Sequence, residues 1–405
     1  MRVPAKATHQ QTRVHNERLV LRILYDRSPI SRADIARQTH LTRTTVSNVV
    51  ATLFERGMVE EVGRGPSSGG KAPILLRLLG DARLVIGLDL GEEVFIGALV
   101  NLRGELRDVA ERPVGGCRGN DALQLVYQLC DRLVDAAAPS AQGSPVGIGV
   151  GSPGVVDGRS GSIRWAVNLG WQNLPLGQLL SKRYGLPVSL ANDSQAAALA
   201  EFVFGEGIRA PNLIVIKVGW GIGAGIILGD ELFQGDGFGA GEIGHVSAVD
   251  DGALCSCGRR GCLETVASAR AILRHARALA AETPGSLLFR ASRHQAELTL
   301  DDVHAAFEAG DPAAQTAVLA AGRYLGRAIA SLLGTLDVHR VLLHGSVTAF
   351  GEPWLRAVRD EVTQRSLPQL AEAAEIELVS FRSNVVVLGA SALLLTSELG
   401  FSPAR

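Results

Sequence analysis

One histidine and three cysteines lie close together in the second half of the sequence, in the run GHVSAVDDGALCSCGRRGCLET. They are His245, Cys255, Cys257 and Cys262. One imidazole and three thiolates form a tetrahedral ligand set that zinc accepts, and thiolates select zinc over magnesium or calcium. Four protein ligands leave no open position, so we expect a structural Zn²⁺ rather than a catalytic or reversibly sensed one. The alternative is a set of free buried cysteines beside a core histidine.

The five cysteines are an odd number, and their crowding favours metal ligation over a disulfide framework. Cys117 and Cys130 have no such neighbours and are expected to be ordinary buried thiols. Arg2 and Lys6 are followed by no apolar core, so no signal peptide is predicted, and no apolar run reaches the length of a membrane span. We expect a cytoplasmic protein with no membrane partner.

A second group of polar residues follows a short apolar strand in LPVSLANDSQAAALAEFVFGEG. Asn192 and Asp193 stand between this strand and an alanine-rich helix. Polar side chains at the carboxyl end of a strand are typical ligand positions in α/β proteins. The alternative for Asp193 is a purely structural role as the N-cap of the helix.

Two similar segments are expected to position these groups. Residues 84–106 and residues 213–235 share one rhythm of apolar strand, glycine turn and apolar strand. Two copies of one unit, each followed by mixed strands and helices, predict a duplicated α/β body with a ligand cleft between its lobes. We therefore divide the chain into a head over 1–80, a first lobe over 81–200 and a second lobe with the zinc site over 201–405.

The head is basic, with 13 Lys and Arg against 6 Asp and Glu, whereas the remainder holds 27 against 35. A helix is expected over 17–25, and Ser31 and Thr42 are placed to cap two more helices. The third helix repeats apolar residues at i, i+3, i+4, i+7 and i+8, and the runs 58–63 and 73–78 resemble two strands. This order predicts a winged helix-turn-helix.

In a winged helix the third helix enters the major groove by its N-terminal residues, which here are polar. The wing loop carries basic residues among glycines, suited to a phosphate backbone. The predicted DNA contacts are Arg43, Thr44, Thr45, Ser47 and Asn48 of the helix, with Arg64 and Lys71 of the wing. The predicted partner is operator DNA. The alternative is a helical protein-interaction module with a solvated polar face.

Taken together, these segments resemble the ROK family (repressors, open reading frames, kinases), in its longer branch with a DNA-binding head. The resemblance rests on GSPGVVD, NDSQAAALAE, VGWGIGAGIILGDELFQG, GAGEIGH and CSCGRRGCLET, in that order. It implies an α/β protein: an N-terminal winged helix-turn-helix followed by a two-lobed actin/hexokinase-like ATPase fold. It also implies a sugar ligand and a homodimer or homotetramer.

The resemblance implies a sugar site as well. The residues that match the family's motifs are Asn192, Asp193, Glu242, His245 and Glu264. In the family's kinases the aspartate is the general base for the hydroxyl that is phosphorylated. His245 would serve twice, with one ring nitrogen on zinc and the other donating a hydrogen bond to the sugar.

Three departures from the family's kinases concern phosphate binding. The kinases carry an Asp-x-Gly-Gly-Thr-Lys-like loop where this chain has Glu92 and Glu93, Trp220 replaces a threonine, and His344 precedes Gly345 where paired glycines are usual. Carboxylates repel a polyphosphate, and the hydroxyl is lost. We therefore expect a sugar-responsive repressor without catalytic residues. An ATP-dependent sugar kinase with an accessory DNA-binding head is the alternative, and the sequence does not identify the sugar.

Overall fold

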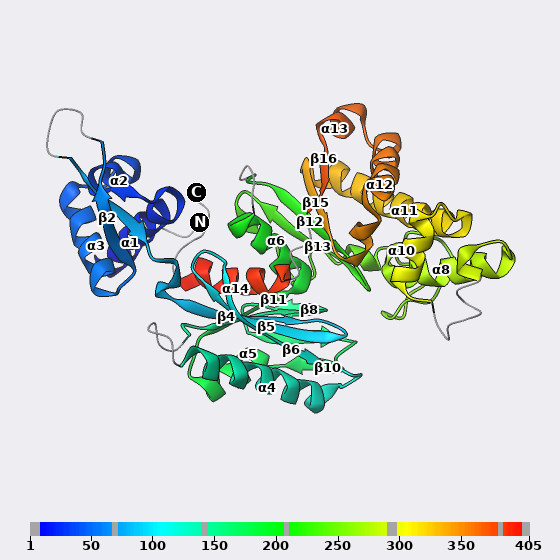
Figure 1. Ribbon diagram of the computed structural model, residues 1–405, viewed down its shortest axis with the longest axis horizontal. Helices are drawn as coiled ribbons and strands as arrows, with labels where there is room; N and C mark the ends of the chain where they lie inside the picture. Colours follow the sequence, from blue (N-terminus) through cyan, green and yellow to red (C-terminus); the bar gives the residue numbers. More distant parts are fainter. Residues whose placement is uncertain are drawn as a thin grey trace.

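A small head precedes two α/β lobes in the computed structural model, and the three parts can be distinguished in Figure 1. The structure describes residues 9–66, 72–138, 145–205, 210–289, 298–379 and 384–398. Lys71, one of the predicted wing residues, lies outside them. No helix in the described ranges is long and apolar enough to cross a membrane.

The head is the predicted winged helix-turn-helix. It contains α1 (His9–Arg27), α2 (Arg32–Thr39) and α3 (Arg43–Glu55), with a sheet of β1 (Ile30–Ser31), β3 (Ile74–Leu78) and β2 (Val59–Arg64). Both predicted caps are present, because the Asp34 N–H donates to the Ser31 hydroxyl and the Thr45 N–H donates to that of Thr42. The buried face of α3 consists of Val46, Val49, Val50 and Leu53.

The first lobe has a five-stranded sheet in the order β11-β7-β4-β5-β6. Its strands are β4 (Leu84–Leu90), β5 (Val94–Asn101), β6 (Leu106–Pro113), β7 (Ile148–Ser152) and β11 (Val188–Asn192). Helices α4 (Gly119–Ala137) and α5 (Leu176–Tyr184) belong to this lobe. A small sheet of β8 (Val155–Asp157), β9 (Ser162–Ala166) and β10 (Trp171–Leu174) lies beside it.

The second lobe repeats this plan with a sheet in the order β14-β13-β12-β15-β16. Its strands are β12 (Leu213–Val218), β13 (Ile222–Leu228), β14 (Glu231–Leu232), β15 (Arg340–His344) and β16 (Glu375–Leu378). Its helices are α7 (Glu264–Ala267), α8 (Ala269–Glu282), α10 (Leu300–Glu308), α11 (Pro312–Leu336), α12 (Gly351–Arg365) and α13 (Pro368–Ala373). In both sheets three antiparallel strands adjoin two parallel ones. The predicted duplication is therefore confirmed.

Two helices, α6 (Asp193–Phe204) and α14 (Val385–Glu398), lie between the two sheets (Figure 1). Their buried alanines, valines and leucines share one core with residues of both sheets. The packing depends on glycines: a Cβ on Gly389 would lie 1.6 Å from the Ala196 carbonyl oxygen. The pair of helices thus joins the lobes and fixes the start of α6, where Asp193 stands.

Candidate functional site

The exposed surface of α3 begins at its N-terminal turn. Arg43, Thr44, Ser47 and Asn48 are exposed, and Arg64 is exposed at the end of β2. Thr45 is half-buried, and its hydroxyl lies 2.9 Å from that of Thr42, so it is partly engaged in the cap. The start of α3 and the end of β2 therefore present these five exposed polar side chains to a ligand.

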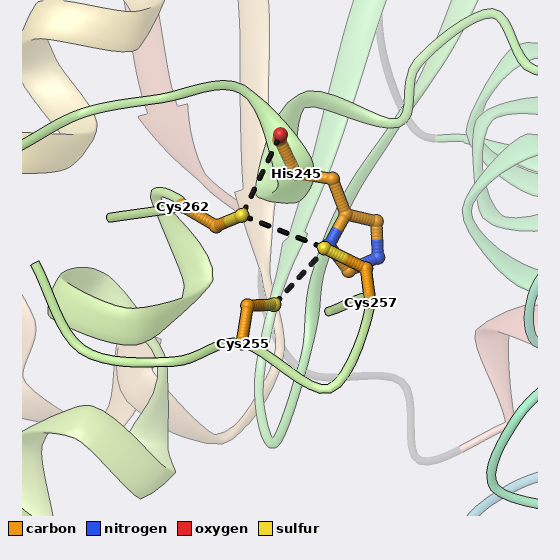
Figure 2. Close-up of side chains that lie close together, drawn as sticks. All are labelled: His245, Cys255, Cys257 and Cys262. Atoms are coloured by element: carbon orange, nitrogen blue, oxygen red, sulfur yellow. Dashed lines mark hydrogen bonds between the residues drawn. The ribbon is translucent and has the colours of Figure 1, made fainter. Parts of the chain in front are cut away.

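The predicted metal ligands form one cluster, drawn in Figure 2. The ligand atoms of His245, Cys255, Cys257 and Cys262 all lie within 4.8 Å of one another. Sγ of Cys257 is 3.6 Å from Sγ of Cys262, and Sγ of Cys255 is 3.5 Å from Nδ1 of His245. Zn–S bonds of about 2.3 Å place two tetrahedral sulfurs roughly 3.8 Å apart. The cluster therefore has the composition and the size of a tetrahedral metal site.

His245 turns its two ring nitrogens to different neighbours. Nδ1 faces the thiols, whereas Nε2 lies 3.8 Å from Oε2 of Glu242. A metal on Nδ1 would leave the proton on Nε2, which could then donate to a carboxylate or to a ligand hydroxyl. The metal cluster and the neighbouring carboxylates therefore share one histidine.

A cleft of about 710 Å³ opens beside this cluster, between the lobes. The five residues predicted to bind a sugar all line it: Asn192, Asp193, Glu242, His245 and Glu264. The cleft lies where parallel strands of both sheets end, since β11 ends at Asn192 and β15 ends at His344. Such strand ends are the usual ligand positions of open α/β sheets.

Asn192, rather than Asp193, is the N-cap of α6. Its Oδ1 accepts from the N–H of Ser194 at 2.8 Å, and its Nδ2 donates to the carbonyl of Gly154 at 2.9 Å. The side chain therefore fastens α6 to the first lobe, with Glu242 Oε1 at 3.5 Å from the same Nδ2. The N-cap role, the alternative considered for Asp193, therefore belongs to Asn192.

Asp193 forms an ion pair that the sequence analysis did not include. Nζ of Lys217, on β12, donates to Asp193 Oδ2 at 2.6 Å, and the two side chains are 28% and 17% exposed. Burial alone would lower the pKa of Lys217, but Asp193 and Asp89 raise it above its usual value. In the sequence, the available sign of this ion pair is a single lysine within the apolar run LIVIKV. Its partner stands 24 residues away, which no local pattern reveals.

Glu242 and Glu264 complete the acidic part of the cleft. Burial raises the pKa of Glu242 to about 7, and the charges of Asp193 and Glu264 add to this effect. Glu264 Oε2 accepts from the N–H of Ile222 at 3.3 Å. It lies so near Gly221 that a Cβ there would be 2.9 Å away. The glycine after Trp220 thus leaves room for this carboxylate.

The residues of the altered phosphate loops also have partners. Glu92, in the turn after β4, accepts from Arg270 at 2.7 Å, and Arg270 belongs to α8 of the second lobe. His344 is buried, and burial together with the charge of Lys217 lowers its pKa to about 3. The cleft on this side therefore contains a neutral imidazole and an ion pair between the lobes.

Comparison with known proteins places these features in a family. The ROK family model matches residues 85–397, and the MarR family model matches residues 15–61. A xylose repressor of Caldicellulosiruptor bescii is 34% identical, over 95% of this chain and 96% of its own length. The crystal structure of a ROK family transcriptional regulator, a homolog of the E. coli MLC protein, covers 96% of this chain and 98% of its own, at 26% identity and a TM-score of 0.83.

A third relative, a kinase, matches only about three quarters of this chain. The ROK family glucokinase from Streptomyces griseus, solved in complex with glucose and AMPPNP, is 28% identical and covers 76% of this chain and 98% of its own, with a TM-score of 0.67. Both repressors and kinases thus share the two-lobed body. Because the ROK model spans more than three quarters of the sequence, the chain belongs to the ROK family.

Proposed function

We propose that this protein is a sugar-responsive transcriptional repressor, in which the head binds operator DNA and the interlobe cleft binds the inducer. The observation that carries the proposal is the union, in one chain, of a winged helix and a cleft lined by all five predicted hydroxyl-binding residues. The repressor similarity over nearly the full length of both chains supports it.

The charges of the cleft favour an uncharged sugar. Asp89, Glu92, Asp193, Glu242 and Glu264 line it, against Lys217, which is already paired with Asp193, and the exposed Arg259. Carboxylates accept hydrogen bonds from hydroxyls but repel phosphate and carboxylate groups. A sugar hydroxyl would meet acceptors on several sides, with the Nε2 of His245 as a donor. We therefore place sugar phosphates and sugar acids outside the ligand class.

We further propose that the cleft does not transfer phosphate. A general base must be free to accept the hydroxyl proton, but Asp193 is held by the Lys217 ammonium at 2.6 Å. Glu92, in the loop that resembles the kinases' phosphate loop, lines the cleft, is paired with Arg270 and offers no hydroxyl to a phosphate. The kinase alternative is favoured by one observation, the likeness to a glucokinase that binds glucose and AMPPNP. Parallel assay of ATP turnover distinguishes the two.

The metal that fits the cluster best is Zn²⁺, held by His245, Cys255, Cys257 and Cys262. Three sulfurs and one nitrogen in a closed set suit a structural zinc. Bound zinc would fix the ring of His245 and the segment that leads to Glu264. We also propose that the body forms a homodimer or homotetramer, which would present two heads to a palindromic operator.

The experiment that tests the function titrates uncharged sugars into the protein–operator complex, for wild type and for Asp193→Asn. Wild type should change its operator affinity with one of the sugars, whereas Asp193→Asn should bind the operator normally and respond poorly. The amide replaces one acceptor oxygen by an NH2 donor and removes the charge that strengthens the hydrogen bond to a sugar hydroxyl. Equal responses of the two proteins would remove Asp193 from the site. Sugar-dependent ATP turnover by wild type would favour the kinase instead.

A further inference from the structure

One wall of the cleft is apolar, and a strand irregularity creates it. In the small sheet, β9 carries an extra residue: Val155 pairs with Trp165 and Val156 pairs with Ile163, so Arg164 has no opposite partner. Arg164 and Trp165 are both exposed, whereas Ile163 and Ala166 are buried. Bulges of this kind often re-aim a side chain beside a functional site.

The two re-aimed side chains have different surroundings. The Arg164 guanidinium donates to Asp157 at 2.8 Å and lies over the ring of Phe238 in the second lobe. Trp165 lines the cleft with 48% of its surface exposed, and Val167 lines it with 39% exposed. A large indole left open inside a ligand cleft is an informative exception to ordinary burial.

The apolar wall is joined to the polar set by direct contacts. Asn192 donates to the carbonyl of Gly154, and a Cβ on Gly154 would lie 2.1 Å from the carbonyl oxygen of Trp165. Only a glycine therefore allows β9 to lie this close to Asn192 and the start of α6. Trp165 thus belongs to the same compartment as Asn192 and Asp193.

A pyranose has the two kinds of surface that such a compartment would bind. When its hydroxyls are equatorial they form a polar rim, and the axial C–H groups leave both ring faces apolar. An axial hydroxyl interrupts one of these faces. An indole attracts C–H groups with its electron-rich face, while carboxylates accept from the rim.

We propose that Trp165 stacks on the C–H face of the inducer's sugar ring. This inference rests on the proposed sugar-binding function and adds the residue that contacts the apolar face of the ligand. Trp165 thus approaches the ligand from the first lobe, whereas Glu242, His245 and Glu264 approach it from the second.

The test measures binding of D-xylose, D-lyxose, D-glucose, D-mannose and D-galactose to the full-length protein by calorimetry. Wild type should bind at least one of these sugars. For that sugar, Trp165→Ala should lose about tenfold in affinity, and Trp165→Phe should stay within about threefold because an aromatic ring remains. Operator binding without sugar should be unchanged in both variants.

Tryptophan emission supplies a second measurement, since sugar should alter the emission of wild type more than that of Trp165→Phe, in which Trp220 is a remaining indole that lines the cleft. Val109→Ala, an exposed change on β6, is the matched control and should behave as wild type. Wild type that binds none of these sugars overturns the proposed function. Wild type that binds sugar while Trp165→Ala binds it equally well overturns this inference alone.

Discussion

Glu92 shows how far a side chain's role depends on a partner distant in sequence. Its place in a phosphate loop predicts repulsion of a nucleotide, but its contact with Arg270 partly offsets the negative charge on which that prediction rests. Lys217 does the same to Asp193. Both pairs join residues of different elements, so a single sequence shows the charges but not their pairing.

The predictability of the site follows from these distances along the chain. The metal cluster could be predicted because three of its four ligands stand within eight residues, and a short span brings side chains together whatever the fold. The residues Asn192, Asp193, Glu242 and Glu264 were found by motif. Lys217 and Trp165 were missed, since one was hidden in an apolar strand and the other depends on a bulge.

Removal of one thiolate should test the metal cluster. Cys257→Ser leaves three ligands, so we expect loss of bound zinc and a fall in melting temperature of about 5 °C or more, because structural zinc contributes folding energy directly. Elemental analysis and thermal unfolding measure the two effects. Cys117→Ser, outside the cluster, is the control. Wild-type protein purified without zinc, or a Cys257→Ser protein of unchanged stability, would contradict the assignment.

Asp89 gives a stability change with a defined pH dependence. Burial raises its pKa to about 6, Lys217 partly offsets this, and in the described part of the chain its buried Oδ1 has no hydrogen-bond partner. The unfolded carboxyl titrates near pH 4. The charged form of Asp89 therefore lowers the free energy of unfolding. This loss of stability is absent below about pH 4 and complete above about pH 6.

Asp89→Asn should remove this loss of stability. We expect its melting temperature to exceed that of wild type by about 2–4 °C at pH 7.5, corresponding to about 1 kcal/mol, and by nothing at pH 4. Thermal unfolding at the two pH values measures the difference. The exposed Asp135→Asn on α4 should show no such dependence. A gain that is equal at both pH values would point to a cause other than titration of Asp89.

Among the elements, the helices with local signals were predictable. Ser31 and Thr42 cap α2 and α3 as expected, and the apolar repeat placed the buried face of α3 correctly, since caps and periodicity are properties of neighbouring residues. The β8–β9–β10 sheet was not identified. Its strands are three to five residues long and interrupted by a bulge, so they show no alternating pattern.

The exposed start of α3 should carry the base contacts. Arg43→Ala should weaken operator binding by about 1–3 kcal/mol if the guanidinium contacts a guanine, and it should reduce discrimination at that base pair. Fluorescence anisotropy with operator variants measures both effects. Arg56→Ala is the control, because Arg56 follows the other end of the helix and pairs with Glu17. A uniform loss over all sequences would instead indicate a phosphate contact.

The packing of α14 on α6 should be intolerant of a single methyl group. Gly389→Ala would place its Cβ 1.6 Å from the Ala196 carbonyl oxygen, so the helices must separate, and we expect a loss of about 3 kcal/mol or more. Gly334→Ala on α11 meets no atom within 4 Å and should stabilise the protein by up to about 1 kcal/mol. Denaturant unfolding compares the two. Similar values for both variants would show that α6 and α14 are not tightly packed.

At the scale of the molecule, two similar segments of the sequence predicted the duplicated body. No sequence pattern predicted the contact between the head and the body. The head's core is continuous with the body through Leu102 in the β5–β6 turn and through Leu394 and Leu395 of α14. At its other end, α14 lines the cleft with Val385 and Val386. One helix thus touches both the ligand cleft and the head, a relation that exists only in three dimensions.

Two contacts also hold the lobes together across the cleft. Glu92 pairs with Arg270, and the guanidinium groups of Arg159 and Arg164 lie over the ring of Phe238 at 5.5 and 5.7 Å. A ligand can shift operator affinity only if it binds two arrangements of the body unequally. Movement of one lobe against the other would change these contacts and the position of α14 together.

Besides Arg83, which donates to the carbonyl of Arg56, Arg103 is a polar contact through which such a movement would reach the head. Its guanidinium donates to the Tyr25 carbonyl at 2.5 Å and to the Ser28 hydroxyl at 2.9 Å, and it lies 4.9 Å from the centre of the Tyr25 ring. All three contacts join the β5–β6 turn of the first lobe to the end of α1. Their loss would loosen the head without altering either binding surface.

We therefore expect Arg103→Ala to separate sugar binding from its effect on DNA. Sugar affinity without DNA should stay within about twofold of wild type, because the cleft is unchanged, whereas the sugar-induced change in operator affinity should fall by about fivefold or more, equivalent to about 1 kcal/mol of coupling. Calorimetry and anisotropy measure the two quantities on the same preparation. Arg112→Ala, whose guanidinium contacts the carbonyl of the adjacent Glu111, is the control. If Arg103→Ala retains the full response, other contacts carry the coupling, such as the apolar contacts of Leu102, Leu394 and Leu395 or the hydrogen bond from Arg83 to the Arg56 carbonyl.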